Sequence, residues 1–71
     1  MQRVAVASSN LASIGYDAEN QVLEVEFKNG SIYQYEGVPE FAYSDMMTAD
    51  SLGSYFNANI KSQYAFIRVV E

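Results

Sequence analysis

Alternating apolar and polar residues dominate the first half of the chain. Residues 22–28 and residues 31–36 each alternate, and Asn29 and Gly30 separate the two runs. Alternation with a period of two is typical of a strand with one buried face. An Asn-Gly pair favours a two-residue type I′ turn, because both residues tolerate a positive φ. The pattern therefore predicts a β-hairpin with Asn29 and Gly30 as its loop.

A two-residue loop determines the register of this hairpin. It places Phe27 opposite Ile32, and each later pair follows in step. Successive side chains of a strand point to opposite faces of the sheet. We therefore expect a buried apolar face made of Leu23, Val25, Phe27 and Ile32. The opposite face is then expected to carry Glu24, Glu26, Lys28, Tyr33 and Tyr35.

A third strand precedes the hairpin. Residues 12–16 also alternate, and residues 17–21 supply the polar side chains of a turn. Placing Ile14 opposite Val25 brings the apolar residues of both strands to one face. The result is a three-stranded antiparallel meander, to which residues 4–7 would add a short edge strand.

The period changes to that of a helix after residue 38. Pro39 suits a first helical turn, because its φ is already set and it needs no hydrogen-bond partner there. Apolar residues then recur at helical spacing, namely Ala42, Tyr43, Met46 and Met47. Asp50 or Ser51 can cap a second helix, whose apolar positions are Leu52, Phe56 and Ile60. Residues 64–70 are rich in β-forming side chains and predict a final strand.

These elements predict an α+β fold in the order β-β-β-α-α-β. It consists of a small antiparallel β-meander of three strands, a C-terminal strand and two short helices. A chain of 71 residues has room for one domain, so residues 1–71 are assigned to a single domain.

Composition excludes much of the chemistry that enzymes use. The chain contains no cysteine and no histidine, which rules out Ser-His and Cys-His nucleophiles and zinc sites built from these residues. We therefore expect no enzyme activity, no catalytic or metal-binding residue and no cofactor. No segment approaches the roughly 20 apolar residues of a membrane span, and residues 4–7 are too short for a signal peptide. We expect a cytoplasmic protein without a membrane segment.

The net charge and the small size of the chain both indicate which kinds of partner it could bind. Nine acidic and four basic residues give a net charge of −5, which repels nucleic acid over most of the surface. A chain this short buries only about 60% of its surface on folding, so the monomer should be marginally stable. A second copy or another protein would add buried surface, and an aromatic content of 14% suits such an interface.

Two tyrosines of the hairpin are candidates for ligand binding. The predicted register places Tyr33 and Tyr35 side by side on the face opposite the core. Rings in that position could stack on a base or on another planar ligand. In the alternative, the helices cover this face and both rings belong to the core.

The second helix carries the other candidates. Tyr55 and Asn59 lie on one stripe beside the apolar positions, and Asn57 and Lys61 lie towards another. Asparagine is a poor helix former, so two of them in one short helix need a reason. Their amides could bond base edges, or they could hold the backbone of residues 8–10.

Carboxylates form a third group. Glu24 and Glu26 lie on one strand, and Asp17, Glu19 and Asn20 cluster in a turn. Paired carboxylates can transfer protons or hold a hard cation. The turn lacks the length of a calcium loop, and the strand glutamates are typical of a solvated face. We assign neither role to them.

Five short motifs follow one another along the chain, namely residues 8–17, residues 23–30, Tyr33-Gln34-Tyr35, Gly37-Val38-Pro39 and residues 55–61. Together they resemble the KTSC domain, a family named after the C-terminal domain of some lysyl-tRNA synthetases. The resemblance covers about residues 6–70 of this sequence. It implies a module of unknown activity that also occurs as a stand-alone protein in bacteria and phages, and for which RNA binding has been suggested.

The motifs of the family correspond to particular residues here. Its Y-x-Y motif matches Tyr33 and Tyr35, and its helical motif matches Tyr55, Phe56, Asn57, Asn59, Ile60 and Lys61. Relatives often carry arginine or lysine within and just after the second helix, where this chain has Ser54, Ala58 and Gln63. This departure weakens the implied RNA role, because phosphate contacts need nearby cations.

Three functions follow from the sequence. The leading one is a small non-enzymatic domain that binds a protein partner or associates with itself. The alternatives are an RNA- or tRNA-associated accessory module and a site for a small planar or nucleotide-like ligand at the tyrosines. The candidate binding residues are Tyr33, Tyr35, Tyr55, Asn57, Asn59 and Lys61.

Overall fold

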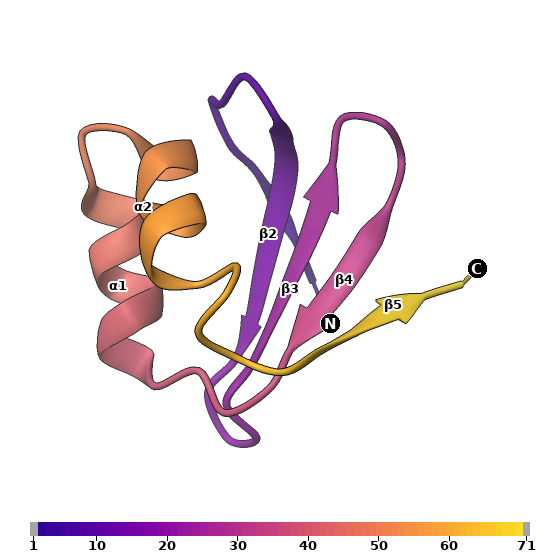
Figure 1. Ribbon diagram of the computed structural model, residues 1–71, viewed down its shortest axis with the longest axis vertical. Helices are drawn as coiled ribbons and strands as arrows, with labels where there is room; N and C mark the ends of the chain where they lie inside the picture. The colour runs from indigo at the N-terminus through magenta and orange to yellow at the C-terminus, as the bar shows by residue number, and fades with distance from the viewer. Residues whose placement is uncertain (1, 71) are drawn as a thin grey trace.

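The computed structural model describes residues 2–70 (Figure 1). Within them the elements follow the order β-β-β-β-α-α-β, so the predicted α+β class is confirmed with one more early strand. The strands are β1 (Val4–Ala5), β2 (Leu11–Asp17), β3 (Val22–Phe27), β4 (Ile32–Tyr35) and β5 (Phe66–Val69). The helices are α1 (Glu40–Thr48) and α2 (Leu52–Asn59). The additional strand, β1, lies within residues 4–7, where a short edge strand was expected.

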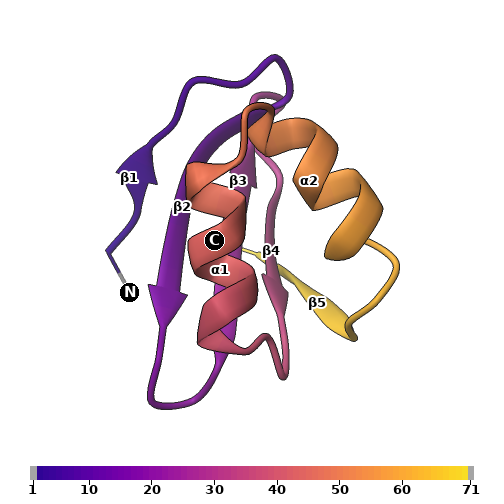
Figure 2. The ribbon, with the colours of Figure 1, turned by 90° about the vertical axis from the view of Figure 1, so that its left-hand side faces the viewer.

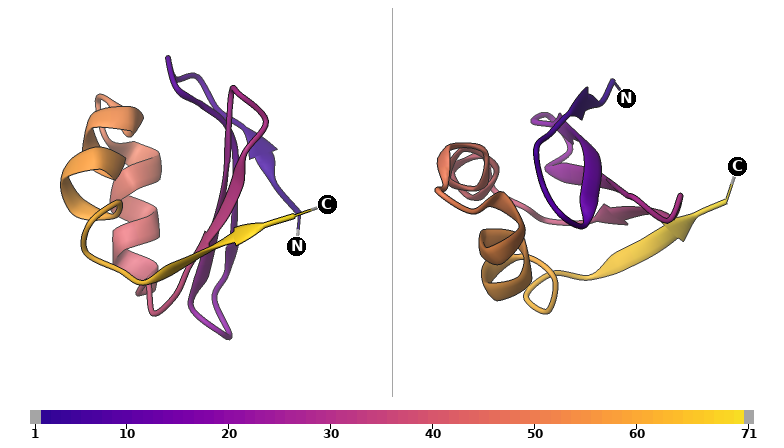
Figure 3. Two further views of the ribbon diagram at one scale, coloured as in Figure 1. Left: turned by 45° about the vertical axis from the view of Figure 1, so that its right-hand side comes forward. Right: turned by 90° about the horizontal axis from the view of Figure 1, so that it is seen from above.

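The five strands form one antiparallel sheet in the order β1-β2-β3-β4-β5. Both helices lie against the same face of this sheet (Figures 1 and 2). The edge strands β1 and β5 lie on the side away from the helices (Figure 3). The predicted pairing of Ile14 with Val25 is confirmed, and a β-bulge between Leu11 and Ser13 precedes it in β2.

The β3–β4 hairpin differs from the prediction by one residue. Val25 pairs with Tyr33, because the loop spans residues 28–30 rather than two residues. Among the three loop residues only Gly30 has a positive φ, of 93°. A type I′ turn needs a positive φ at both of its central residues, so the conformation of Asn29 excludes it.

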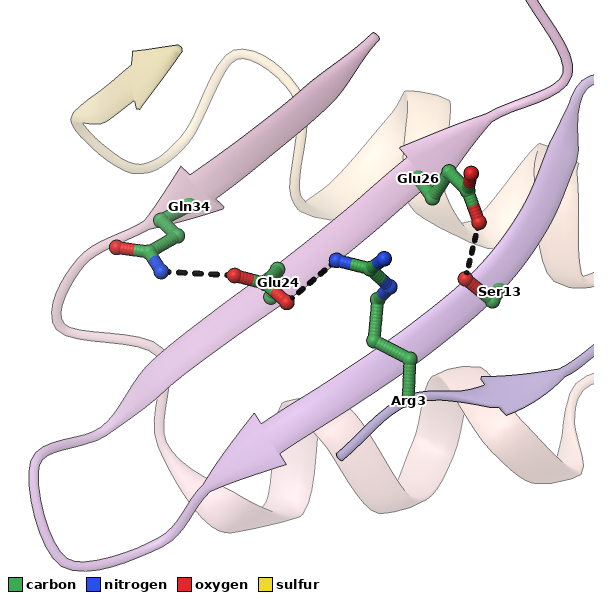
Figure 4. Close-up of polar contacts among 5 residues, drawn as sticks. All are labelled: Arg3, Ser13, Glu24, Glu26 and Gln34. Carbon is green, nitrogen blue, oxygen red and sulfur yellow. Dashed lines mark hydrogen bonds and ion pairs between the residues drawn. The ribbon is translucent and has the colours of Figure 1, made fainter. Parts of the chain in front are cut away.

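The shift of one residue turns β4 over, because side chains alternate between faces. Tyr33 and Tyr35 point towards the helices, and Ile32 and Gln34 point to the opposite face. The prediction that both tyrosines lie opposite the core is therefore wrong. Ile32 is buried as predicted, at 3% exposure, but it points to the face of the sheet opposite Leu23 and Val25. Tyr35 is only 2% exposed and Tyr33 packs against the same core. The helices therefore cover both rings, as the alternative expected, but on the face of Leu23 and Val25 and not on the face of Glu24 and Glu26 (Figure 4).

The core fills the space between the sheet and the two helices. Its buried side chains are Leu11, Ile14, Leu23, Val25, Tyr35, Val38, Ala42, Met46, Phe56 and Ile60. Pro39 is the N-cap of α1. At α2 the hydroxyl of Ser51 accepts a hydrogen bond from the backbone N–H of Ser54 at 3.2 Å, which confirms Ser51 as a capping residue. Neither helix of the described chain is long and apolar enough to cross a membrane.

Candidate functional site

The two tyrosines of the Y-x-Y motif belong to an aromatic cluster made of Phe27, Tyr33, Tyr35, Phe56 and Phe66. The ring of Tyr35 meets Phe56 of α2 edge-on at 5.4 Å between centroids. Tyr33 lies nearly parallel to Phe66 at 5.4 Å. Aromatic pairs at these distances each contribute about 0.5–1.5 kcal/mol beyond the burial of their area. Tyr35 therefore packs β4 against α2, and Tyr33 packs β4 against β5.

Burial also decides what Tyr35 can do chemically. Loss of water around its hydroxyl, followed by the proximity of Tyr33, raises the pKa of Tyr35 above its ordinary value. A tyrosine that is neutral and 2% exposed serves packing rather than proton transfer or stacking on an outside ligand. Ligand binding at these two residues stays a prediction, and the structure supplies no open platform for it.

The candidates on α2 separate into two groups. Asn59 donates a side-chain hydrogen bond to the backbone oxygen of Tyr55 at 3.3 Å, within its own helix. Burial, then the negative charge of Asp45, raises the pKa of Tyr55. Asn57 and Lys61 instead line a groove at the other side of the helix. The four residues therefore do not form one site.

This lysine groove lies between α2, the loop that follows β1 and the β3–β4 turn. Its volume is about 310 Å³. The polar side chains that line it are Ser9, Asn10, Lys28, Asn29, Asn57 and Lys61. Its apolar wall comes from Leu11, Phe27 and Phe56. A backbone hydrogen bond of 2.9 Å from Lys28 to Asn10 joins the β3–β4 turn to the loop after β1.

The pattern of residues along the chain does not predict this groove. Lys28, Asn29 and Asn10 stand out only as turn or loop residues along the chain, and no periodicity connects them to Asn57 or Lys61. The signal that could have found them is charge: two of the four basic residues are lysines, and both line this one groove.

The carboxylates of β3 are engaged in polar contacts on the sheet face away from the helices (Figure 4). Glu24, 6% exposed, forms an ion pair with Arg3 at 2.7 Å. The side-chain amide of Gln34 donates a second hydrogen bond to Glu24 at 2.8 Å. The hydroxyl of Ser13 donates to Glu26, also at 2.8 Å. Glu24 is therefore buried and paired, which differs from the solvated face expected of it.

A glycine makes room for this ion pair. A Cβ atom on Gly15 would lie 2.6 Å from the backbone oxygen of Gln2 and 3.1 Å from Cγ of Arg3. Such distances are shorter than van der Waals contact, so the chain around residues 2–3 passes directly over Gly15. Among residues 2–70 no group of three acidic side chains is placed to hold a metal ion.

Of the carboxylates in the β2–β3 turn, Asp17 forms hydrogen bonds within the turn itself. Asp17 accepts hydrogen bonds from the backbone N–H groups of Glu19 and Asn20 and from the Asn20 side chain, at 2.9–3.2 Å. The bond from the Asn20 side chain is the main reason that the pKa of Asp17 is lowered. These contacts close the β2–β3 turn.

The free edge of β5 is the other notable surface. Phe66 and Ile67 are each 53% exposed and Val70, directly after the strand, is 87% exposed. We call these three residues the β5 edge patch; they share the strand edge, with Phe66 on the helix-covered face beside Tyr33 and Ile67 on the opposite face. Of the remaining exposed large apolar residues, Val4 lies in the opposite edge strand and Phe41 on α1.

Both the sequence and the fold of this chain are similar to those of known proteins. An uncharacterised protein of Stutzerimonas stutzeri is 52% identical over 64 residues, which cover 90% of each chain. A lysine–tRNA ligase of Nostoc punctiforme is 36% identical over 58 residues, and the match spans 82% of this chain but 10% of the ligase. The crystal structure of a KTSC domain protein from Yersinia pestis superposes with a TM-score of 0.91 at 43% identity, covering 97% of both chains.

The family model of the KTSC domain matches residues 7–64, which is most of the chain and includes the Y-x-Y motif, both helices and the lysine groove. The fold, the sequence match and the solved relative agree. The chain belongs to the KTSC domain family.

Proposed function

We propose that this KTSC domain is a non-catalytic interaction module that associates with a second copy of itself through the free edge of β5. The observation that carries the proposal is the β5 edge patch. β5 bonds β4 along one side only, and no further strand within residues 2–70 covers its other side. An edge strand with exposed apolar residues is a template for pairing with another strand.

The charge distribution supports a second copy as the occupant of this edge. Residues 64–70 contain one charged side chain, Arg68, and no acidic one, although the whole chain carries −5. Two identical β5 strands can therefore meet without opposing carboxylates. Antiparallel pairing about a two-fold axis uses the same patch on both copies, as closed dimers do.

The size of the patch determines the strength of the association. Three partly exposed side chains and one strand edge offer less than the roughly 800 Å² per partner of a standard interface. We therefore expect a weak dimer with a dissociation constant of about 10–100 µM. Since both copies are negative, moderate salt should strengthen the dimer by screening their repulsion.

Sedimentation velocity over a concentration series tests the proposal. The expected result is a shift from a 7.9 kDa monomer towards twice that mass as concentration rises. Ile67→Lys, which adds a charge to the patch, should keep the protein monomeric. Phe41→Lys is the matched control, because Phe41 is 68% exposed but lies on α1.

Two outcomes would contradict the proposal. One is a monomer at about 1 mM, far above the expected dissociation constant. The other is dimerisation that Phe41→Lys abolishes and Ile67→Lys does not, since this would place the interface on α1.

The lysine–tRNA ligase relative favours a second candidate, an accessory role beside tRNA. Arg3 is engaged with Glu24, and the chain has nine acidic side chains against four basic ones. A polyanion would therefore meet attraction only locally, and the dimer is the better supported of the two functions.

A further inference from the structure

The lysine groove has the composition of an anion site. Its polar lining offers two ammonium groups, three carboxamides and one hydroxyl, all of which can donate hydrogen bonds. None of the ten residues that line the groove is acidic, in a chain whose acidic residues outnumber its basic ones by nine to four. Positive charge is therefore gathered here against the overall charge of the molecule.

The groove also combines this charge with an apolar wall. Phe27 is half-buried and packs edge-on against Phe56 at 5.7 Å, so part of its ring borders the groove. A volume of about 310 Å³ lies at the lower end of the range of small-molecule pockets, roughly 300–1,000 Å³. Space, aromatic wall and donors together suit a ligand with one planar part and one anionic part.

The positions of the two lysines indicate where the anion would lie. Lys28 begins the β3–β4 turn, and Lys61 directly follows α2 and its C-cap Ile60. They come from different parts of the chain and line the same groove. The bond between the backbones of Lys28 and Asn10 holds the turn in this position.

Asn57 supplies an independent reason to expect a ligand. It is an exposed asparagine inside a helix, where alanine would be more stable. Asn59 is bonded to its own helix, whereas Asn57 lines the groove. An amide in that position can accept and donate at the edge of a planar ring.

We infer that the lysine groove binds a nucleotide, with Lys28 and Lys61 holding its phosphate and Asn57 and Phe27 contacting its base. The site is distinct from the β5 edge patch and does not depend on self-association. The recognised chemistry is a base linked to a phosphate, which either a free nucleotide or a nucleotide within a single strand provides.

Amide chemical-shift titration on the labelled full chain tests the inference. The probes are adenosine 5′-monophosphate, adenosine, inorganic phosphate and a uridine tetranucleotide. We expect the monophosphate to shift the amides of Lys28, Asn29, Gly53 and Asn57, with a dissociation constant of about 1 mM. Adenosine and phosphate alone should each bind more weakly. A tetranucleotide that binds more than about tenfold tighter than the monophosphate would identify the strand as the source.

Variants with matched changes of charge test whether Lys28 and Lys61 bind the phosphate. Lys28→Gln and Lys61→Gln should each weaken binding of the monophosphate about fivefold, as expected for one exposed charge contact. Arg68→Gln is the control, because it makes the same change of net charge, from −5 to −6, on β5. Asn57→Ala should weaken binding without lowering the midpoint of urea unfolding, since alanine favours the helix.

Three results would overturn the inference. The first is the absence of shifts around the groove at about 10 mM monophosphate, ten times the expected dissociation constant. The second is equal binding of adenosine and its monophosphate. The third is an equal effect of the two lysine variants and Arg68→Gln. Binding should weaken as salt rises, whereas the dimer should strengthen, so the two proposals can fail separately.

Discussion

Replacing Tyr35 with alanine should remove a large part of the folding free energy of this domain. The side chain is 2% exposed and its ring lies 5.4 Å from that of Phe56. Truncating a buried aromatic residue to alanine costs about 3–5 kcal/mol, because the lost contacts leave a cavity. A chain of 71 residues has a total stability of only about 4–11 kcal/mol.

Urea unfolding, followed by circular dichroism, measures this loss. With a slope near 1 kcal/mol per molar, as small domains show, the midpoint should fall by about 3–5 M. Phe41→Ala is the control, because Phe41 is 68% exposed and its truncation should cost less than about 0.5 kcal/mol. A loss below about 1 kcal/mol for Tyr35→Ala, at an unchanged slope, would refute the register that places this ring in the core.

Three further predictions concern the polar contacts. Arg3→Ala should cost about 1–3 kcal/mol in urea unfolding, because it leaves the buried carboxylate of Glu24 without its cation, and adding Glu24→Gln should recover part of the loss. Ser51→Ala should cost about 1 kcal/mol through loss of the α2 cap, whereas the exposed Ser62→Ala should leave the midpoint unchanged. The pKa of Asp17 is lower in the folded protein than its ordinary 3.8, so the unfolded chain binds the proton more tightly and stability is lost as pH falls below about 5. Asp17→Asn should flatten this acid limb in urea midpoints measured from neutral to acidic pH; an unchanged limb would contradict the role of Asp17.

Local chemistry made much of the fold predictable. Pro39 and Ser51 mark the starts of both helices, and the apolar spacing of Phe56 and Ile60 identifies the face of α2 that enters the core. These signals depend on neighbours in sequence, and in both helices the tertiary packing agrees with them. The pairing of Ile14 with Val25 could be predicted because apolar side chains alternate around both residues, although a β-bulge interrupts β2 before Ser13.

The register of the β3–β4 hairpin depends on more than its local sequence. Asn29 and Gly30 are compatible with a loop of two residues and with one of three, and the longer loop takes Lys28 out of the strand and leaves Asn29 with a negative φ. Packing of Tyr35 against Phe56 favours the longer loop, and that contact joins residues 21 positions apart. The lysine groove could not be predicted for the same reason, because it combines a turn, a loop and a helix.

The two edge strands suggest how the domain would sit within a larger protein. β1 and β5 are the first and last elements of the described chain, and both lie on the side away from the helices (Figure 3). A neighbour joined to either end would attach on that side. In such an arrangement the helices face away from the neighbouring domain. The lysine groove beside α2 then stays accessible to ligands.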